Sequence, residues 1–260
     1  MSDFQGRFVW YELMTTDAVA AAAFYRRVVG WTARDMSQPG MPYTILGVGD
    51  YGVGGLFQLT KEHCDAGGKP GWIGYIAVDD VDAIAARLVK AGGTVHKQPA
   101  DIPHVGRFAM VADPEGTGFV LFKPIPPPVM SAPPPEGTPG TFGWRELIAA
   151  DWERMFPFYE SLFGWKRQKA MPMGPLGVYQ TYSASSGEEM GGMMTRPPNN
   201  DAVLPGWTFY TNVDDIRAAA ARVKDAGGKV LNEPMEVPGS RWIIVCRDPQ
   251  GAHFALLAPR

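Results

Sequence analysis

Cysteine, net charge and long apolar runs are all scarce in this chain of 260 residues. The two cysteines, Cys64 and Cys246, form no C-x-x-C pair and are too few for a disulfide scaffold. A formal net charge of −3 provides no field that would attract nucleic acid or acidic lipid. No run approaches about 18 uninterrupted apolar residues, so the sequence predicts no membrane-spanning helix.

Signals for secretion and for nucleotide binding are also missing. The N-terminal stretch MSDFQGRFVW has no basic segment followed by an apolar run, so we expect no signal peptide and a cytoplasmic location. No phosphate-binding loop, nucleophile elbow or dinucleotide fingerprint occurs. We therefore expect a monomer or homodimer whose partner is a small molecule, with no cofactor, nucleic acid or membrane partner.

The chain contains the same pattern twice, and a repeat of this length predicts two related domains. In the first and last matched segments, WYELMTTD corresponds to WRELIAAD and DPEGTGFVLF to DPQGAHFALL. Four pairs of matched segments begin at Trp10 and Trp144, Phe24 and Phe158, Pro70 and Pro205, and Asp113 and Asp248.

A proline-rich stretch separates the two copies. Eight of the 17 residues in 124–140 are proline, which fixes φ and removes an amide donor. Such a segment predicts a semi-rigid extended linker, with a reach of roughly 50 Å. We predict one domain over residues 5–123, the linker over 124–140, and a second domain over 141–259.

Each copy predicts two successive units of a strand, a helix and further strands, which is an α+β fold. RFVWYELMT is rich in aromatic and β-branched residues and predicts a strand. Asp17 suits the start of the helix that follows, and Gly30 suits its end. Asp79 or Asp80 suits the start of the next helix. Two units side by side would form a curved sheet around a shared cavity.

Two small motifs have structural explanations. In DP-x-G, proline suits the second position of a tight turn and glycine the fourth, so Asp113 and Asp248 are expected to form turns. The glycine pairs at 54–55 and 191–192 are expected to mark bulges or tight curvature within a strand.

These motifs resemble the vicinal oxygen chelate superfamily, also called the glyoxalase/bleomycin-resistance/dioxygenase superfamily. The resemblance is carried by TTDAVAAAAFYRRVVGW, YIAVDDVDAIAARLVKAGG and DPEGTGFVLFKP, each with its partner in the second copy. It is greatest to a tandem two-domain subgroup described as hydroxylase-like or glyoxalase-like. It implies two tandem glyoxalase-like domains, each of two βαβββ units around a cavity.

The resemblance also implies where a divalent metal would be bound. The corresponding positions are Trp10, Ile73 and Val120 in the first copy, and Trp144, Thr208 and Ala255 in the second. A metal site needs three or four N, O or S donors, and these residues do not supply them. We therefore predict no metal at the family position.

Side chains two residues away should share the cavity wall, because strand side chains alternate between faces. This reasoning places the following residues on the wall: Trp10, Glu12, Tyr75, Trp144, Glu146, Thr208, Tyr210 and His253. The tryptophans are explained equally by core filling or by an aromatic wall for a flat ligand.

Glu12 and Glu146 are open to two interpretations because burying a carboxylate is costly unless it is paired. One is a structural ion pair with Arg107 or Arg241, which are also candidate ligand-binding residues. The other is a ligand anchor or general base, since an unpaired buried glutamate has a raised pKa. His253 has no counterpart in the first copy and is either a hydrogen-bonded filler or a third catalytic group.

The sequence thus predicts a protein that binds a small, partly aromatic molecule, or transforms it without a metal; whether it is an enzyme stays open. One alternative is a divalent-metal-dependent lyase, isomerase or dioxygenase of the glyoxalase type, with Gln58, Glu12 or His253 regrouped around the ion. Another is a regulatory module that docks through the proline-rich linker.

Overall fold

The computed structural model describes residues 4–37, 42–125, 132–184, 187–198 and 203–259. The chain divides into two compact units, each of which combines part of one repeat with part of the other. The first unit contains Met1–Val9, Ile73–Met130 and Trp144–Trp207; the second contains Trp10–Trp72, Ser131–Gly143 and Thr208–Arg260. The sequence repeat and the compact unit are therefore different groupings, and the predicted domain boundaries stay a prediction.

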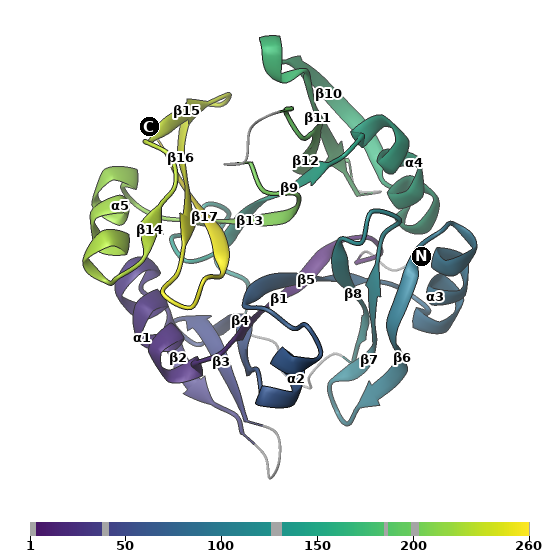
Figure 1. Ribbon diagram of the computed structural model, residues 1–260, viewed down its shortest axis with the longest axis horizontal. Helices are drawn as coiled ribbons and strands as arrows, with labels where there is room; N and C mark the ends of the chain where they lie inside the picture. Colours follow the sequence, from purple (N-terminus) through teal and green to yellow (C-terminus); the bar gives the residue numbers. More distant parts are fainter. Residues whose placement is uncertain (1–3, 38–41, 126–131, 185–186, 199–202, 260) are drawn as a thin grey trace. The chain divides into compact units, whose positions relative to one another are not determined.

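The first unit contains two four-stranded arrangements, each with one α-helix (Figure 1). In one, the strand order is β5-β8-β7-β6; in the other it is β10-β11-β12-β9. The elements are β5 (Gly71–Ala77), α3 (Val81–Lys90), β6 (Thr94–Ile102), β7 (Gly106–Ala112), β8 (Gly118–Pro124), β9 (Phe142–Ala149), α4 (Trp152–Phe163), β10 (Lys166–Pro172), the short 3-10 helix η1 (Gly174–Leu176), β11 (Val178–Ser183) and β12 (Glu189–Thr195).

The second unit repeats this plan with the remaining halves of the two repeats. Its strand orders are β2-β3-β4-β1 and β13-β17-β16-β14, with β15 also paired to β16. The elements are β1 (Phe8–Thr15), α1 (Ala18–Val29), β2 (Thr32–Asp35), β3 (Tyr43–Val48), β4 (Tyr51–Gln58), α2 (Lys61–Asp65), β13 (Gly206–Asn212), α5 (Ile216–Asp225), β14 (Lys229–Val230), β15 (Met235–Val237), β16 (Arg241–Arg247) and β17 (His253–Pro259).

The four long helices begin and end as the sequence predicts. Each begins after an aspartate whose side chain accepts hydrogen bonds from first-turn backbone N–H groups, which otherwise have no partner in the helix. These caps are Asp17, Asp80, Asp151 and Asp215, so Asp80 rather than Asp79 starts α3. Gly30 ends α1 in the left-handed conformation, at φ 87°, which favours glycine.

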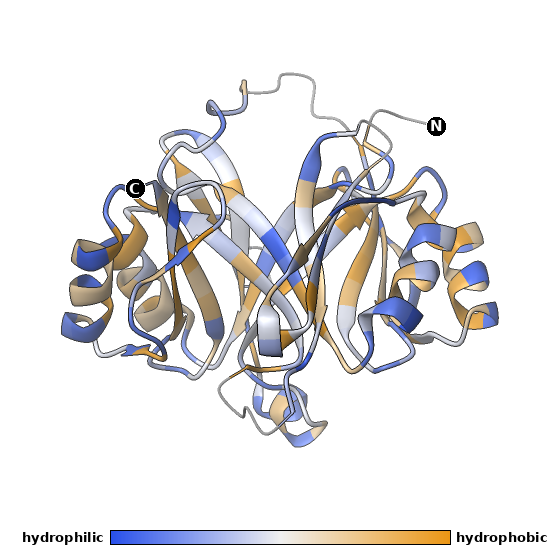
Figure 2. Ribbon diagram, turned by 90° about the horizontal axis from the view of Figure 1, so that it is seen from above, coloured by the Kyte–Doolittle hydropathy of each residue, from blue (hydrophilic) through white to orange (hydrophobic). Residues whose placement is uncertain are grey.

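Each unit buries the apolar side of its helices in its own hydrophobic core. Figure 2 shows hydrophilic positions on the helix sides that are turned away from the strands. In α1 the buried side consists of Ala21, Phe24, Tyr25 and Val28, at the three- and four-residue spacing of one helix side. In the described parts of the chain, no helix has the length and apolar character needed to cross a membrane.

A buried hydrogen-bond chain joins the two repeats inside the second unit. The Tyr25 hydroxyl, on α1, donates to Asp248 Oδ2 over 3.2 Å and accepts from Trp72 Nε1 over 2.9 Å. Asp248 is only 4% exposed, and it also accepts from the backbone N–H groups of Gln250 and Ala252. The aspartate of the second DP-x-G motif therefore forms its turn and also binds the first helix of the first repeat.

The first unit contains the reciprocal chain. The Tyr159 hydroxyl, on α4, donates to Asp113 Oδ2 over 2.9 Å, and the Trp207 ring packs edge-on against the Tyr159 ring with centroids 5.6 Å apart. Asp113 is 2% exposed and accepts from the backbone N–H groups of Glu115 and Thr117. The turn predicted for both motifs is confirmed, and each turn also joins one repeat to the other. We call each buried Asp–Tyr hydrogen bond, together with the tryptophan that packs on the tyrosine, a clasp.

The aromatic residues next to the clasps strengthen this packing. Trp165 stacks on Tyr159 with ring centroids 5.1 Å apart, and its Nε1 donates to Gly6 O over 2.8 Å. Trp31 stacks on Tyr25 at 5.4 Å and donates to Gly140 O over 2.7 Å. Since Gly140 ends the predicted linker, this bond holds the last linker residue in the second unit; linker residues 126–131 lie outside the described residues.

We expect Tyr25→Phe and Tyr159→Phe each to lower the free energy of unfolding by about 2 kcal/mol. Each variant removes a hydrogen bond to a buried carboxyl group, and bonds to charged groups contribute roughly 1.5–3 kcal/mol. Urea unfolding followed by circular dichroism measures the loss. Tyr51→Phe is the matched control, since its hydroxyl has no hydrogen-bond partner among the described residues, and it should change stability by less than about 0.5 kcal/mol. Losses as small as the control's for both clasp variants would contradict the role given to the clasps.

Candidate functional site

In the first repeat, three polar or aromatic side chains form a hydrogen-bonded chain on one face of the sheet. Trp10 Nε1, on β1, donates to the Tyr43 hydroxyl on β3 over 3.0 Å. The same hydroxyl hydrogen-bonds Glu12, which lies two residues after Trp10 on β1. The indole therefore donates to the phenol, and the phenol donates to the carboxylate.

The burial pattern of β1 shows which face holds this chain. Tyr11, Leu13 and Thr15 are buried, whereas Trp10 and Glu12 are half-buried. This alternation is expected of a strand with one face in the core and the other accessible. Trp10 and Glu12 therefore lie on the less buried face of β1, and that this face lines a ligand cavity stays a prediction.

Gly55 explains how Tyr43 reaches Glu12 from a strand that is not adjacent to β1. Gly55 is the Cα partner of Glu12 in the parallel pair of β1 and β4, so β4 lies between the two side chains. A Cβ atom at Gly55 would overlap the Tyr43 hydroxyl and ring. The glycine is therefore needed so that the phenol can lie across β4. An irregularity does adjoin the glycine pair, as predicted: Leu46 faces Gly54 and Gly47 faces Gly52, so Val53 is an extra residue on β4.

The second repeat has the same arrangement in the first unit. Trp144 Nε1 donates to the Tyr179 hydroxyl over 2.7 Å. Gly192 is the Cα partner of Glu146, and a Cβ atom at Gly192 would overlap the Tyr179 ring. Tyrosine, glycine and glutamate thus have the same relative placement in both repeats. We call the two sets, Trp10–Tyr43–Glu12 and Trp144–Tyr179–Glu146, the triads.

The negative charge of Glu12 keeps the Tyr43 phenol protonated. Burial raises the pKa of Tyr43 well above its usual value, and the charge of Glu12 raises it further. A phenol that stays neutral is a permanent hydrogen-bond donor to the carboxylate. The hydrogens of the Trp10 indole N–H and the Tyr43 hydroxyl are thus used within the triad. A ligand on this face would meet acceptor atoms, namely the oxygens of Glu12 and Tyr43.

Sequence reasoning missed both tyrosines of the triads. It reached Trp10 and Glu12 from the two-residue period of one strand, but Tyr43 lies on another strand whose register no local pattern reveals. The available signal was the repeat itself, because each copy has a tyrosine followed by a Gly-Gly pair (Tyr43 with 54–55, Tyr179 with 191–192).

Gln58, one of the donors considered for a regrouped metal site, has a structural role. Its Oε1 accepts from Ala18 N over 2.8 Å, and its Nε2 donates to Thr16 O over 2.6 Å. The side chain thereby holds the first turn of α1 against β4. In the second repeat Thr195 makes the corresponding bond, from Trp152 N to its hydroxyl over 3.3 Å.

The two arginines considered as partners of the glutamates are placed differently. Arg107 forms ion pairs with Asp82, at 2.6 Å, and with Asp101, at 2.9 Å. These carboxylates occupy its guanidinium, so the idea that Arg107 is the counter-ion of Glu12 is wrong. Arg241 is half-buried at the start of β16 and has no ion pair among the described residues.

The other predicted wall residues lie on buried strands. Tyr75 is 8% exposed, is in register with Val120, and packs against Phe122 with ring centroids 5.6 Å apart. Tyr210 and Thr208, on β13, are 3% and 5% exposed. Tyr75 and Tyr210 each belong to the compact unit that does not contain the triad of their own repeat. Their role in ligand binding stays a prediction.

His253 is a neutral side chain with a free buried nitrogen. Its Nε2 is buried and has no hydrogen-bond partner within the described ranges. Burial, and then the charge of Arg247 on the paired strand, lowers the pKa of His253 to about 4. Nε2 therefore offers either a lone pair or an N–H group, and both interpretations of His253, as a hydrogen-bonded filler or as a catalytic group, stay predictions.

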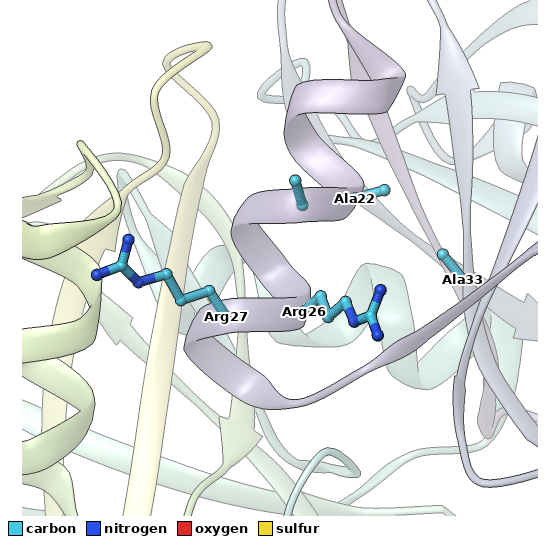
Figure 3. Close-up of a pocket in the computed structure, with 5 residues that line it drawn as sticks. Ala22, Arg26, Arg27 and Ala33 are labelled. Carbon is cyan, nitrogen blue, oxygen red and sulfur yellow. The ribbon is translucent and has the colours of Figure 1, made fainter.

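Two surface hollows lie in the second unit. One, of about 520 Å³, is lined by Ala22, Ala23, Arg26, Arg27 and Ala33. Figure 3 shows that Arg26 and Arg27 point in different directions, so they do not converge on one ligand. The other, of about 190 Å³, lies over β2, β3 and β4 and includes Ile45 and Gly52. No group of three His, Cys, Asp or Glu side chains suited to a metal gathers among the residues that the structure describes.

Comparison with known proteins places both repeats in one family. The model of the Glyoxalase/Bleomycin resistance protein/Dioxygenase superfamily matches residues 7–121 and 141–256. The chain belongs to this superfamily. CFP32 of Mycobacterium bovis, a protein named as a glyoxylase, is 33% identical over 264 residues, which cover 98% of this chain and 95% of CFP32.

A second relative and a solved structure extend the comparison. The anthracycline biosynthesis protein DauV of Streptomyces sp. (strain C5) is 31% identical, over 98% of this chain and 94% of DauV. The Mn(II)-bound glyoxalase from Novosphingobium aromaticivorans superposes with a TM-score of 0.66 at 18% identity, over 98% of this chain and 82% of that one. The expected fold is confirmed: this superfamily member has two tandem glyoxalase-like domains of α+β class.

The six residues that the resemblance predicts at the metal-ligand positions have side chains that do not suit a divalent ion. In the first repeat, Trp10 uses its only polar hydrogen on Tyr43, and Ile73 and Val120 are buried hydrocarbon side chains. In the second, Trp144 donates to Tyr179, Ala255 is apolar, and Thr208 is a lone buried hydroxyl. None of the six positions supplies the imidazole, thiolate or carboxylate group that a divalent ion requires.

A double-mutant cycle tests the fit between Tyr43 and Gly55. Gly55→Ala should lower the free energy of unfolding by about 1–3 kcal/mol, because the new methyl group must displace the phenol. The same substitution in a Tyr43→Ala background should cost less, leaving a coupling energy above about 1 kcal/mol in urea unfolding. Additive effects would show that the glycine does not accommodate the phenol.

The depressed pKa of His253 predicts that the protein loses stability in acid. The folded-state pKa of this side chain is depressed, so its contribution is complete above pH 6.5 and is lost as pH falls toward about 4. A shift of this size corresponds to about 3 kcal/mol. Urea unfolding at pH 7 and pH 4 should therefore show a steeper decline for the wild type than for His253→Gln, by roughly that amount. Parallel declines would mean that His253 titrates normally in the folded protein.

Proposed function

We propose that this superfamily member binds a small, partly aromatic molecule through a triad and holds it, or transforms it, without a metal ion. The observation that carries the proposal is the hydrogen-bonded chain from Trp10 through Tyr43 to Glu12 on a half-buried sheet face. This chain places a carboxylate and two aromatic rings where a ligand has access.

The chemistry of the triad favours a ligand with hydroxyl or amino groups. A carboxylate only accepts hydrogen bonds, and it has about four acceptor positions. Tyr43 donates to Glu12 and retains a lone pair, so it too offers an acceptor to the ligand. The indole of Trp10 supplies an aromatic surface. An anionic ligand would be repelled by Glu12, whereas a phenol or an amine would donate to it.

Metal-independent proton transfer is the reaction this chain supports best. Glu12 and Glu146 would accept a proton from the bound molecule, and a carboxylate in a partly apolar setting is a suitable base. His253, neutral near pH 7, would be a further proton acceptor in the second repeat. The unsuitable side chains at the ligand positions of the superfamily support a mechanism without metal. A relative named for anthracycline biosynthesis supports a role in small-molecule metabolism.

The second candidate is a divalent-metal-dependent lyase, isomerase or dioxygenase of the glyoxalase type. Similarity to a Mn(II)-bound glyoxalase favours it. It would require Glu12 or His253 to bind the metal together with donors from positions that the superfamily does not ordinarily use. Gln58 is not available as a donor, because its side chain hydrogen-bonds the backbone at the start of α1. A cytoplasmic location and a monomeric or homodimeric state stay predictions for either candidate.

Fluorine NMR on the full-length protein separates the two candidates. We expect the ¹⁹F signal of 4-fluorophenol to broaden with the chelator-treated wild type, and that of 4-fluorobenzoate to stay sharp. Glu12→Gln and Tyr43→Phe together should weaken 4-fluorophenol binding by about tenfold, the effect of losing roughly 1.4 kcal/mol. Tyr51→Phe is the matched control and should bind as the wild type does. Binding of neither compound to the metal-free protein, with binding restored by Mn²⁺, would contradict the proposal and favour the metal enzyme.

A further inference from the structure

The two triads lie in surroundings that differ at one decisive position. Gly52, on β4, precedes the first glycine pair by two residues, and Glu189, on β12, precedes the second pair by the same spacing. The strand pairings confirm that these positions correspond, since Gly52 is opposite Gly47 and Glu189 is opposite Ser183. The first repeat therefore lacks a side chain where the second has a long, charged one.

In the first repeat, the missing side chain leaves a hollow beside the triad. This hollow of about 190 Å³ is lined by Thr32, Arg34, Ile45, Gly47, Gly49, Asp50 and Gly52. A Cβ atom at Gly52 would lie 3.3 Å from Ile45 Cγ2 and 3.4 Å from Trp10 Cη2. The outer edge of the Trp10 indole is thus close to the floor of the hollow. Arg34 and Asp50 contribute opposite charges to the rim.

In the second repeat, the corresponding residues bind one another. Glu189 Oε1 is 3.2 Å from Lys169 Nζ and accepts from the Thr181 hydroxyl over 3.2 Å. Gln168 Nε2 donates to Ser183 Oγ over 2.8 Å. These groups cover the face that the hollow occupies in the first repeat, and neither of the two surface hollows described above includes any of them.

The burial of matching residues agrees with this difference. Thr181 is 2% exposed, whereas its counterpart Ile45 is half-buried; Ser183 and its counterpart Gly47 are both buried. A ligand on the second repeat would have to break the ion pair and two side-chain hydrogen bonds. In the first repeat, no ion pair among the described residues crosses the hollow.

We infer that the first repeat is the ligand-binding copy, that its ligand inserts a single aromatic ring into the hollow floored by Gly52, and that the second repeat is a closed copy. This inference rests on the proposed function and specifies which triad performs it. The hollow is smaller than the roughly 300–1,000 Å³ of pockets that enclose drug-sized ligands. It accommodates one ring, with the rest of the ligand over Trp10, Tyr43 and Glu12.

Transferring the residue that closes the second repeat tests the inference directly. Gly52 has no left-handed φ, so a side chain is sterically allowed in its backbone conformation. Gly52→Glu should fill the hollow and weaken 4-fluorophenol binding by at least about tenfold in ¹⁹F line-broadening titrations of the full-length protein. The reverse change, Glu189→Gly, should leave binding at or above the wild-type level. Gly52→Ala adds only a methyl group and should reduce binding by less than about threefold.

The thermal unfolding midpoint of Gly52→Glu will show whether this variant folds. If it does not fold, a second pair of variants tests the inference. Glu12→Gln should reduce binding about tenfold, whereas Glu146→Gln should leave it unchanged within about twofold. Loss of binding in Glu146→Gln with retention in Glu12→Gln, or equal loss in both, would overturn the inference while the proposed function survives. Absence of 4-fluorophenol binding to the wild type would overturn the proposed function and the inference with it.

Discussion

Two buried aspartates, Asp113 and Asp248, hold the repeats of this chain together. Each accepts backbone hydrogen bonds within its own DP-x-G turn and a hydroxyl from the first helix of the opposite repeat. Because the two clasps are reciprocal, neither repeat completes its own compact unit. Burial of a carboxyl group is costly, and it raises the pKa of both aspartates. The backbone N–H donors of each aspartate's own turn offset part of that cost, and the tyrosine hydroxyl offsets more only when both repeats are in place.

The triads depend on a second constraint, the absence of a side chain at Gly55 and Gly192. Without a Cβ atom there, a tyrosine can lie across a strand and reach the glutamate on its far side. Hydrophobic burial thus determines which side chains occupy the core face of each strand. On the accessible face, the room left by the missing Cβ atom determines which side chains can meet. Function, as we propose it, uses the accessible face, where Gly52 and Glu189 have let the two repeats diverge.

Much of the fold could be predicted from local sequence, because caps, turns and strand periods are local properties. Asp17, Gly30 and both DP-x-G motifs were interpreted correctly on these grounds. The grouping of the compact units was not predictable, since it depends on contacts between residues as distant as Tyr25 and Asp248. The period of β1 placed Trp10 and Glu12 on one face, but Tyr43 required the register of two further strands. Arg107 was misjudged because its partners were recognisable only once β7 had been placed beside β6, which holds Asp101, and against α3, which holds Asp82.

The central proposal is a ligand site without metal that is formed by Trp10, Tyr43 and Glu12. The most direct measurement is a crystal structure of the protein soaked with 4-bromophenol, with the bromine located by its anomalous scattering. We predict one bromine peak in the hollow beside Trp10, with the phenol hydroxyl directed at Glu12. A peak at the second triad alone, or at a metal ion bound by other residues, would contradict the account.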